Sequence, residues 1–307
     1  MNFQSLEYVR AVAEERSFTR AAAKLHVTQQ TLSAHIAGLE RELGRELFVR
    51  RAPLELTHEG AVFLAHADRL RAELANLRRE VAGPDRLQAG TLRVGVAYTR
   101  GRALLPPVIE RLCREYPNVR VQLDEGTNDE ILANLAAGRE DLAIFAVTAA
   151  QKRPGIVLED FYEERIALLA SKGLLSAHGL APEGLAEPLS RGDLSPLKDL
   201  PFVLGGAADI TGGLGLSLFA DAGIDPVVRV QSNNMETLLA LCLRGVGACL
   251  CPRNLLATAA PPEARAALEA FDLGPGASYR ILFGLPGGGY RWAVTDAFMR
   301  LARDAVA

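Results

Sequence analysis

The sequence predicts a protein of α+α/β class, with a winged helix-turn-helix at the N-terminus, a long linker helix and two α/β lobes. Three observations support this prediction. Two helical runs flank a tight turn within residues 18–43, apolar residues then recur with strict four-three spacing over residues 63–81, and strand-like and helix-like runs alternate after Thr91. Such changes in hydrophobic period mark changes in secondary structure.

Composition narrows the class of protein. The chain has 307 residues, of which 49% are hydrophobic and 23% charged, as in a globular protein with two or three domains. No apolar run is long enough to span a bilayer, and the first ten residues lack the basic-then-apolar layout of a signal peptide. We therefore expect a cytoplasmic protein with no membrane contact. The four cysteines are scattered in apolar runs, which argues against a disulfide framework.

Charge alone does not point to a nucleic-acid partner. The formal net charge is −3, and the first 58 residues carry 8 Lys and Arg against 7 Asp and Glu. A general positive field is therefore absent. Any DNA contact must depend on where individual arginines are placed.

Capping residues divide the N-terminal region into helices. Ser17 and Thr28 are placed to cap the second and third helices, because a hydroxyl can accept an orphan backbone N–H. Gly44 is placed to end the third helix, and residues 47–56 resemble a short hairpin. One stripe of apolar residues predicts the buried face of the third helix: Leu32, Ile36, Leu39 and Leu43.

The fourth helix carries a narrow heptad seam. Thr57 is placed to cap it, and Gly83-Pro84 ends it before a linker to Gly90. Such a narrow stripe favours packing against a partner helix, although packing on its own domain remains the alternative. The predicted dimerisation residues are Phe63, Ala67, Leu70, Leu74, Leu77 and Val81. The predicted domains are residues 1–58, 59–90 and 91–307.

From Thr91 the pattern becomes strand, helix, strand, helix, which implies a parallel α/β sheet. It starts with residues 92–96 and restarts near Phe202. We interpret this as two lobes, lobe I covering about 91–165 and 270–307, and lobe II about 166–269. Residues 156–169 and 270–283 would cross between the lobes and form the hinge.

The motifs at residues 17–50, 105–123, 130–144 and 235–252 resemble those of the LysR-type transcriptional regulators, and the resemblance covers essentially the whole chain. Residues 17–50, SFTRAAAKLHVTQQTLSAHIAGLERELGRELFVR, are similar to that family's DNA-binding signature. Residues 105–123, 130–144 and 235–252 are similar to its effector-domain hallmarks. The resemblance implies a dimerising linker helix, an effector domain like a periplasmic binding protein, and control of transcription by a small metabolite. It also implies a homodimer that pairs again as a dimer of dimers, with RNA polymerase as a possible partner.

The third helix would read a double-stranded DNA operator from the major groove. By resemblance, Gln29 and Ser33 match positions that commonly touch DNA, and glutamine can pair with adenine. The predicted DNA-binding residues are Arg20, Thr28, Gln29, Gln30, Thr31, Ser33, Arg50 and Arg51. The chain departs from its relatives at Gln30, where proline is usual, and it lacks basic residues around Ala34. We therefore expect weak binding by one subunit and tight binding by linked copies.

Ligands of α/β lobes sit beyond the carboxyl ends of the strands. The predicted effector-binding residues at these ends are Tyr98, Thr99, Arg100, Gly126, Thr127, Asn128, Val147, Thr148, Gly205, Ile210 and Asn233. Arg100 could grip an acidic ligand through its guanidinium group, and an acidic or aromatic metabolite is expected. The alternative is an exposed Arg100, or an internal bridge to Glu125 or Asp209.

Three other classes of function fit the sequence less well. An enzyme is disfavoured because residues 91–307 contain one histidine, His178, and no metal, phosphate-loop or dinucleotide motif in context. The Gly-rich runs 212–217 and 284–289 are assigned turn or capping roles. A thiol sensor built on Cys249 and Cys251 is disfavoured by their apolar setting. A plain solute-binding protein is disfavoured by the DNA-binding motif. No cofactor and no metal are expected.

Overall fold

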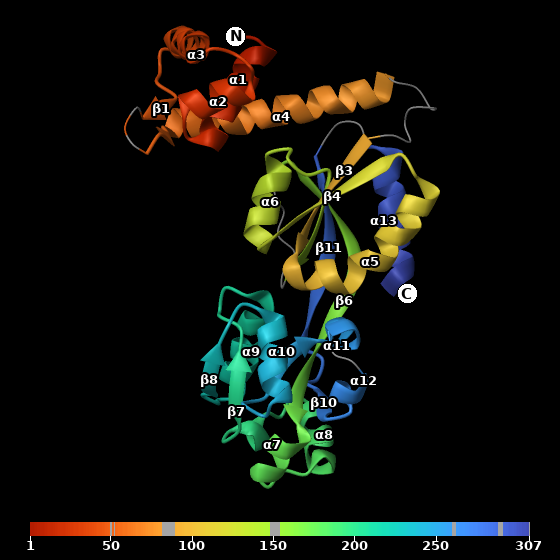
Figure 1. The fold of residues 1–307 in the computed structure, drawn as a ribbon. Helices are drawn as coiled ribbons and strands as arrows, with labels where there is room; N and C mark the ends of the chain where they lie inside the picture. Colours follow the sequence, from red (N-terminus) through yellow and green to blue (C-terminus); the bar gives the residue numbers. More distant parts are fainter. Residues whose placement is uncertain are drawn as a thin grey trace.

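The computed structural model describes residues 1–49, 51, 53–81, 90–147, 154–259, 262–287 and 291–306. Figure 1 shows a small helical domain at one end, a long helix that extends from it, and two α/β lobes stacked beyond that helix. Within the described residues, no helix combines the length and the apolar character needed to cross a lipid bilayer.

The N-terminal domain begins with three helices whose caps lie where the sequence places them. Ser17 accepts the backbone N–H of Arg20, and Thr28 accepts that of Thr31. Gly44 ends the third helix in the left-handed conformation, with φ 66°. The Ser17 and Thr28 side chains satisfy backbone N–H groups that a helix start leaves without a partner. The helices are α1 (Phe3–Glu15), α2 (Phe18–Lys24) and α3 (Gln29–Leu43).

A two-stranded wing follows the third helix. Strands β1 (Phe48–Val49) and β2 (Glu55–Leu56) pair antiparallel. The buried carboxylate of Glu40 on α3 accepts the backbone N–H of Leu47 at 2.8 Å, which fixes the entry to the wing. The fourth helix passes so close to this point that a Cβ on Gly60 would lie 2.0 Å from the Leu47 carbonyl oxygen. Glycine is therefore required there.

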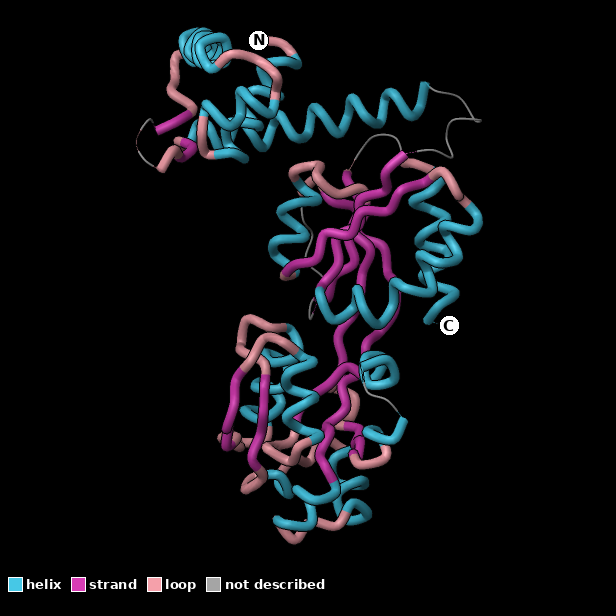
Figure 2. Tube along the Cα trace, viewed as in Figure 1, coloured by secondary structure: helices cyan, strands magenta, loops and turns pink. Residues whose placement is uncertain are grey.

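The long helix α4 (His58–Val81) starts in the N-terminal domain and lies over lobe I (Figures 1 and 2). Thr57 caps it by accepting the N–H of Gly60 at 2.9 Å. Its Asp68 is buried, and a carboxylate oxygen lies 3.3 Å from a guanidinium nitrogen of Arg139 in lobe I. The linker helix thus makes a charged contact with the lobe beneath it.

Lobe I is a mixed sheet covered on both faces. Strands β3, β4 and β5 run parallel, as predicted, whereas β11 pairs antiparallel with β5 on one side and with β6 on the other. The predicted parallel sheet is therefore present in these three strands, and the whole sheet is mixed because the two crossing segments themselves become strands of it. Figure 1 shows α6 on one face and α5 with α13 on the other. The bounds are β3 (Gly90–Ala97), α5 (Tyr98–Glu115), β4 (Val119–Gly126), α6 (Asn128–Ala136), β5 (Leu142–Val147), β11 (Ser278–Pro286) and α13 (Ala293–Val306).

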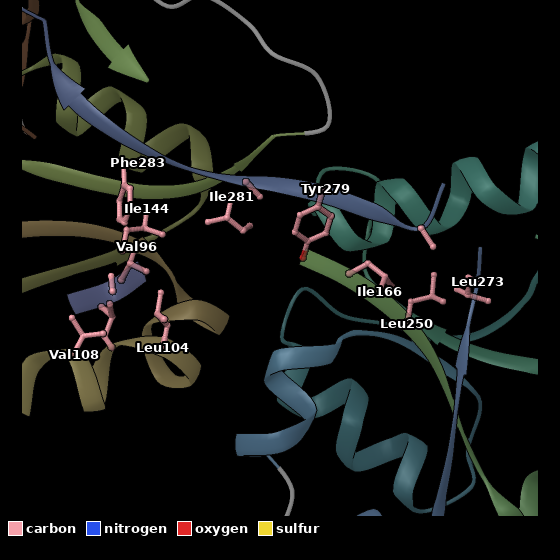
Figure 3. Close-up of a cluster of buried hydrophobic side chains, with 14 of the residues drawn as sticks. Val96, Leu104, Val108, Ile144, Ile166, Leu250, Leu273, Tyr279, Ile281 and Phe283 are labelled. Carbon is pink, nitrogen blue, oxygen red and sulfur yellow. The ribbon is translucent and has the colours of Figure 1, made fainter. Parts of the chain in front are cut away.

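Strand β6 (Ile156–Ser171) belongs to both lobes. Its first part pairs with β11 in lobe I, and its last part pairs with β9 and β10 in lobe II. One core cluster runs along this crossing, and Figure 3 shows it passing from Ile144 and Phe283 through Tyr279 to Ile166 and Leu250. The predicted crossing over residues 156–169 is thus present, while residues 270–283 divide into two strands.

Lobe II contains more short helices than the sequence predicted. A parallel pair, β7 with β8, lies beside β9, and α10 and α11 pack on a second cluster that includes the three buried cysteines. The bounds are α7 (Lys172–Ala177), α8 (Pro182–Ser190), β7 (Pro201–Leu204), α9 (Ile210–Asp221), β8 (Val227–Gln231), α10 (Met235–Leu243), β9 (Cys249–Pro252), α11 (Arg253–Ala259), α12 (Pro262–Arg265) and β10 (Leu268–Asp272).

The Gly-rich run 212–217 is helical, so its assignment to a turn or cap was wrong. It lies inside α9. A Cβ on Gly212 would lie 2.5 Å from the backbone of Gly205, and one on Gly215 would lie 2.1 Å from the Leu250 side chain. The glycines allow α9 to approach β7 and β9 closely. In the second run, residues 284–286 belong to β11, and residues 288–289 lie outside the described residues.

Candidate nucleic-acid interface and interlobe site

The first turn of α3 is an exposed polar surface. Gln29, Gln30 and Thr31 are exposed, and Ser33 is half-buried one turn later. The Gln29 amide donates to the Ser33 hydroxyl at 3.3 Å, and the Thr28 and Thr31 hydroxyls lie 2.8 Å apart. Apolar residues Leu32 and Ile36 hold the opposite face of the helix in the domain core. This arrangement leaves the polar side chains accessible to an external partner.

The positive charges around this surface are partly offset. Arg20 lies beside Glu15, at 3.7 Å, and donates to its backbone oxygen. Lys24 lies 3.0 Å from both Glu14 and Glu15. Arg51 on the wing is largely exposed and only 3.9 Å from Glu55. Arg50 lies outside the described residues.

The heptad seam of α4 divides into two parts. Phe63 packs against the core of the N-terminal domain, and Ala67 is buried within the chain. Leu70 and Leu77 are 47% and 54% exposed, and Leu74 is half-buried. The side chain of Val81 lies outside the described part. The C-terminal half of the seam is therefore the part that remains open to a partner helix.

A cavity of about 350 Å³ lies between the lobes. Helix α5 of lobe I forms one wall, and α11 of lobe II forms another, with β6 and the end of α13 completing it. Its apolar walls come from Leu104, Pro107, Leu255 and Val306, and its polar groups come from Arg100, Tyr162, Glu164, Arg253, Asn254 and Thr258. A site of this size suits a small organic ligand.

Arg100 is the buried positive group of this cavity. Its residue is only 5% exposed, and its Nε has no hydrogen-bond partner. Its guanidinium carbon lies 5.5 Å from the centroid of the Tyr279 ring, a cation–π distance. Arg100 is therefore not an exposed arginine, and among the described residues it forms no ion pair with Glu125 or Asp209.

Glu164 is the buried negative group of the same cavity. It is 3% exposed, and the Tyr162 hydroxyl donates to its Oε2 at 2.9 Å. Burial raises the pKa of Glu164, while the Tyr162 hydroxyl, the Arg100 charge and Asn254 oppose that rise. Burial likewise raises the pKa of Tyr162, which stays a neutral donor.

Tyr279 connects this site to lobe II. Its hydroxyl lies 3.1 Å from that of Thr211 in the first turn of α9, and both residues are buried. A second contact between the lobes is the ion pair of Arg102 on α5 with Glu236 on α10. The residues around Arg100 are therefore attached to helices of both lobes.

Three other predicted effector residues use their polar side chains within the chain. Thr127 shares a capping box with Glu130, and the Asn128 amide bonds both backbone groups of Ala146. Asn233 accepts the N–H of Gly206 at 3.3 Å. Of the predicted set that the structure describes, only Arg100 lines the cavity.

The remaining predicted effector residues are placed as follows. Tyr98 is 63% exposed, Gly126 and Gly205 are buried, and Val147 and Ile210 are half-buried. The side chain of Thr99 and the whole of Thr148 lie outside the described part.

Tyr162, Glu164 and Asn254 were missed by the sequence reasoning. Glu164 lies in a strand that carries several glutamates, and nothing in the sequence separates the buried one from its exposed neighbour Glu163. Asn254 lies on α11, a short helix that no periodic pattern indicated. The one usable signal was the position of these residues next to the predicted crossing.

Three cysteines are inert by burial. Cys242, Cys249 and Cys251 are fully buried in one cluster of lobe II. The neighbouring Cys242 and burial raise the pKa of Cys249, and burial raises the pKa of Cys251 to about 12. Thiolate is the reactive form, so the thiols of Cys249 and Cys251 are poor nucleophiles. Cys113 is exposed on α5.

Comparison with known proteins agrees with this geometry. Residues 3–61 match the family model "Bacterial regulatory helix-turn-helix protein, lysR family", and residues 85–307 match the "LysR substrate binding domain". OxyR of Escherichia coli strain K12, a DNA-binding transcriptional dual regulator, is 31% identical over 264 residues, covering 86% of this chain and 81% of its own.

Two solved structures show the same fold. A full-length OxyR variant from Pseudomonas aeruginosa has a TM-score of 0.77 at 24% identity, over 99% of this chain and 95% of its own. Full-length CbnR in complex with its target DNA has a TM-score of 0.67 at 22% identity, over 99% and 100%. The two family models and the OxyR relative show that the chain belongs to the LysR family of DNA-binding transcriptional regulators with an effector-binding domain, and the two solved structures share its fold.

Proposed function

We propose that this regulator responds to a small acidic ligand bound in the interlobe cavity. The observation that carries the proposal is Arg100, which is buried, lies in a cavity shared by both lobes, and has an unpartnered Nε. A buried guanidinium is costly unless its N–H groups are satisfied, and a ligand carboxylate would satisfy them in bidentate fashion.

The ligand would act by changing how the lobes sit against each other. The cavity walls belong to α5 in lobe I and α11 in lobe II, and the Arg102–Glu236 pair lies across the same boundary. A ligand that contacts both walls favours one lobe arrangement by its differential affinity. The Asp68–Arg139 contact offers a route from lobe I to the linker helix.

The N-terminal domain would bind a double-stranded operator with α3 in the major groove. Gln29, Gln30, Thr31 and Ser33 would face base edges, while Arg20, Arg50 and Arg51 would contact the backbone. Because part of this charge is offset within the domain, tight binding would require linked copies.

We further propose the division into residues 1–58, 59–90 and 91–307, and a homodimer formed through Leu70, Leu74 and Leu77. These side chains leave an apolar surface that a second copy of the helix would cover. Two such dimers would pair, and the assembly would contact RNA polymerase. The protein would act in the cytoplasm as a regulator that carries no cofactor and catalyses no reaction.

The buried cysteines of lobe II do not fit a thiol-based peroxide sensor. Relatives include proteins named hydrogen peroxide-inducible genes activator, but sensing of that kind requires a reactive thiolate. Cys249 and Cys251 are fully buried, and the pKa of each thiol is raised. A small ligand at Arg100 is the better-supported signal.

The test uses the full-length protein in a thermal-shift screen against benzoate, 3-phenylpropanoate, 4-methylpentanoate and L-amino acids. A bound ligand at one hundred times its Kd should stabilise the protein by about 2.7 kcal/mol. Arg100→Met should abolish that shift, whereas Arg114→Met, on the exposed face of the same helix, should keep it. A ligand that stabilises wild type and Arg100→Met equally would contradict the proposal.

A further inference from the structure

Two opposite buried charges face one small cavity without pairing. Arg100 and Glu164 are 5% and 3% exposed, and both line the cavity between the lobes. The Arg100 charge acts on the Glu164 carboxyl, yet no ion pair between them is found among the described residues. Separated charges in a poorly solvated site remain costly until each meets a partner.

Each of these charges is held in place by an aromatic residue. The ring of Tyr279 lies against the Arg100 guanidinium, and the Tyr162 hydroxyl donates to Glu164. Tyr279 is held in turn by Thr211, and Tyr162 packs against Phe161. The two charged groups are thus fixed rather than free to swing together, as a pre-organised site requires.

Arg253, the third charged residue of the cavity, already forms an ion pair. Arg253 lies 2.7 Å from Asp272, and its side chain is 47% exposed. The remaining wall combines neutral polar groups, such as Asn254 and Thr258, with apolar residues that include Leu104, Pro107 and Leu255. The cavity therefore presents one anion-binding group, one cation-binding group and an apolar surface.

We propose that the interlobe cavity selects an amphoteric ligand, an α-amino acid with an apolar side chain, whose carboxylate pairs with Arg100 and whose ammonium group pairs with Glu164. This rests on the proposed function and makes it more specific. A carboxylate alone would leave Glu164 without a cationic partner, and an amine alone would leave Arg100 without an anionic partner. Only a ligand with both charges neutralises both groups at once.

The test is a binding titration of the full-length protein with three matched sets of probes. The amino acids are L-leucine and L-phenylalanine, the acids are 4-methylpentanoate and 3-phenylpropanoate, and the amines are 3-methylbutylamine and 2-phenylethylamine. Each amino acid should bind at least about tenfold more tightly than its matched acid or amine, because charge-assisted hydrogen bonds are the strong ones.

Matched variants locate the effect. Glu164→Gln should weaken amino-acid binding by about tenfold or more and leave acid binding unchanged or tighter. Glu163→Gln, the adjacent residue on the exposed face of β6, should change neither. Unchanged operator binding by both variants would show that they are folded.

The pH dependence in wild type needs no variant. The groups facing Glu164 are Arg100 on α5, Tyr162 on its own strand, Tyr279 on β11 and Cys251 on β9. Glu164 has a raised pKa, so it ionises as pH rises through that raised value. Amino-acid affinity should then increase, because the carboxylate attracts the ammonium group, whereas acid affinity should decrease.

Several outcomes would overturn this inference. Acids that bind as tightly as the amino acids, with Glu164→Gln changing neither, would remove Glu164 from recognition while leaving an Arg100-dependent acidic effector intact. Failure of both amino acids to bind would also overturn it. Binding that survives Arg100→Met would instead count against the proposed function itself.

Discussion

The N-terminal domain and lobe I each bury a glutamate side chain, and they differ in whether its carboxylate is hydrogen-bonded. Glu40 in the N-terminal domain is 8% exposed, and its carboxylate accepts the backbone N–H of Leu47. Glu140 in lobe I is 2% exposed, and neither of its oxygens has a hydrogen-bond partner of normal geometry. The first carboxylate stabilises the fold by fixing a loop, whereas the second opposes folding.

Burying Glu140 disfavours its charged form, and its pKa is raised accordingly. Burial raises its pKa to about 8, Asp124 adds to the rise, and the nearby Asn134 and Arg139 offset part of it. Its Oε2 occupies the space that a Cβ on Gly95 would take, 2.0 Å away. Lobe I thus tolerates a buried carboxylate whose oxygens lack a hydrogen-bond partner, whereas the buried carboxylate of Glu40 is satisfied by Leu47.

The largest effect is expected where the N-terminal domain is tightest. Gly60→Ala should lower the free energy of unfolding by about 3 kcal/mol, because the new methyl group meets the rigid backbone of Leu47. Chemical denaturation of the full-length protein would measure this. A loss below about 1 kcal/mol would show that the wing shifts easily and that the local fit is not strict.

Glu140→Gln in lobe I should raise the free energy of unfolding, the opposite of the effect expected for Gly60→Ala. The unfolded carboxyl ionises near 4.5 and the folded one near 8, so wild type loses stability as pH rises between these values. The variant should be more stable than wild type by about 2 kcal/mol at pH 8. This is less than the full stability loss implied by the pKa difference, because the buried amide of the variant also needs hydrogen-bond partners. At pH 4 the gain should vanish, and melting curves at the two pH values would test this.

The smallest effect is expected on α3. Gly38→Ala should stabilise the N-terminal domain by about 1 kcal/mol, because alanine is the better helix former and no atom lies within 4 Å of the added Cβ. Gly38 and Gly60 are thus matched substitutions with opposite expected signs. An unchanged or lower melting temperature for Gly38→Ala would contradict the helix-propensity argument.

Local chemistry explains which features the sequence predicted well. The caps at Ser17, Thr28 and Gly44 depend on residues within one turn, so their identity is enough to place them. Residues 156–169 were predicted to cross between the lobes, and in the structure this segment is the strand β6, Ile156–Ser171. The division of the α4 seam required knowledge of what packs beneath Phe63 and Ala67.

The interlobe cavity could be predicted only in part. Arg100 was found because it follows a strand, but its neighbours Glu164 and Asn254 come from distant parts of the chain. Burial of Glu164 is decided by which face of β6 turns inward, and neighbouring glutamates hide that choice in the sequence. The helix that carries Asn254 has only seven residues, too few for a periodic signal.

Strand β6 has a consequence for how the protein can come apart. Its residues Ile166 and Leu168 lie in the same apolar cluster as Ile144 and Phe283 of the other lobe. Melting either lobe would therefore strip hydrogen bonds and apolar cover from the other. The pair should unfold in one cooperative step, and neither lobe can be excised as a self-sufficient fragment.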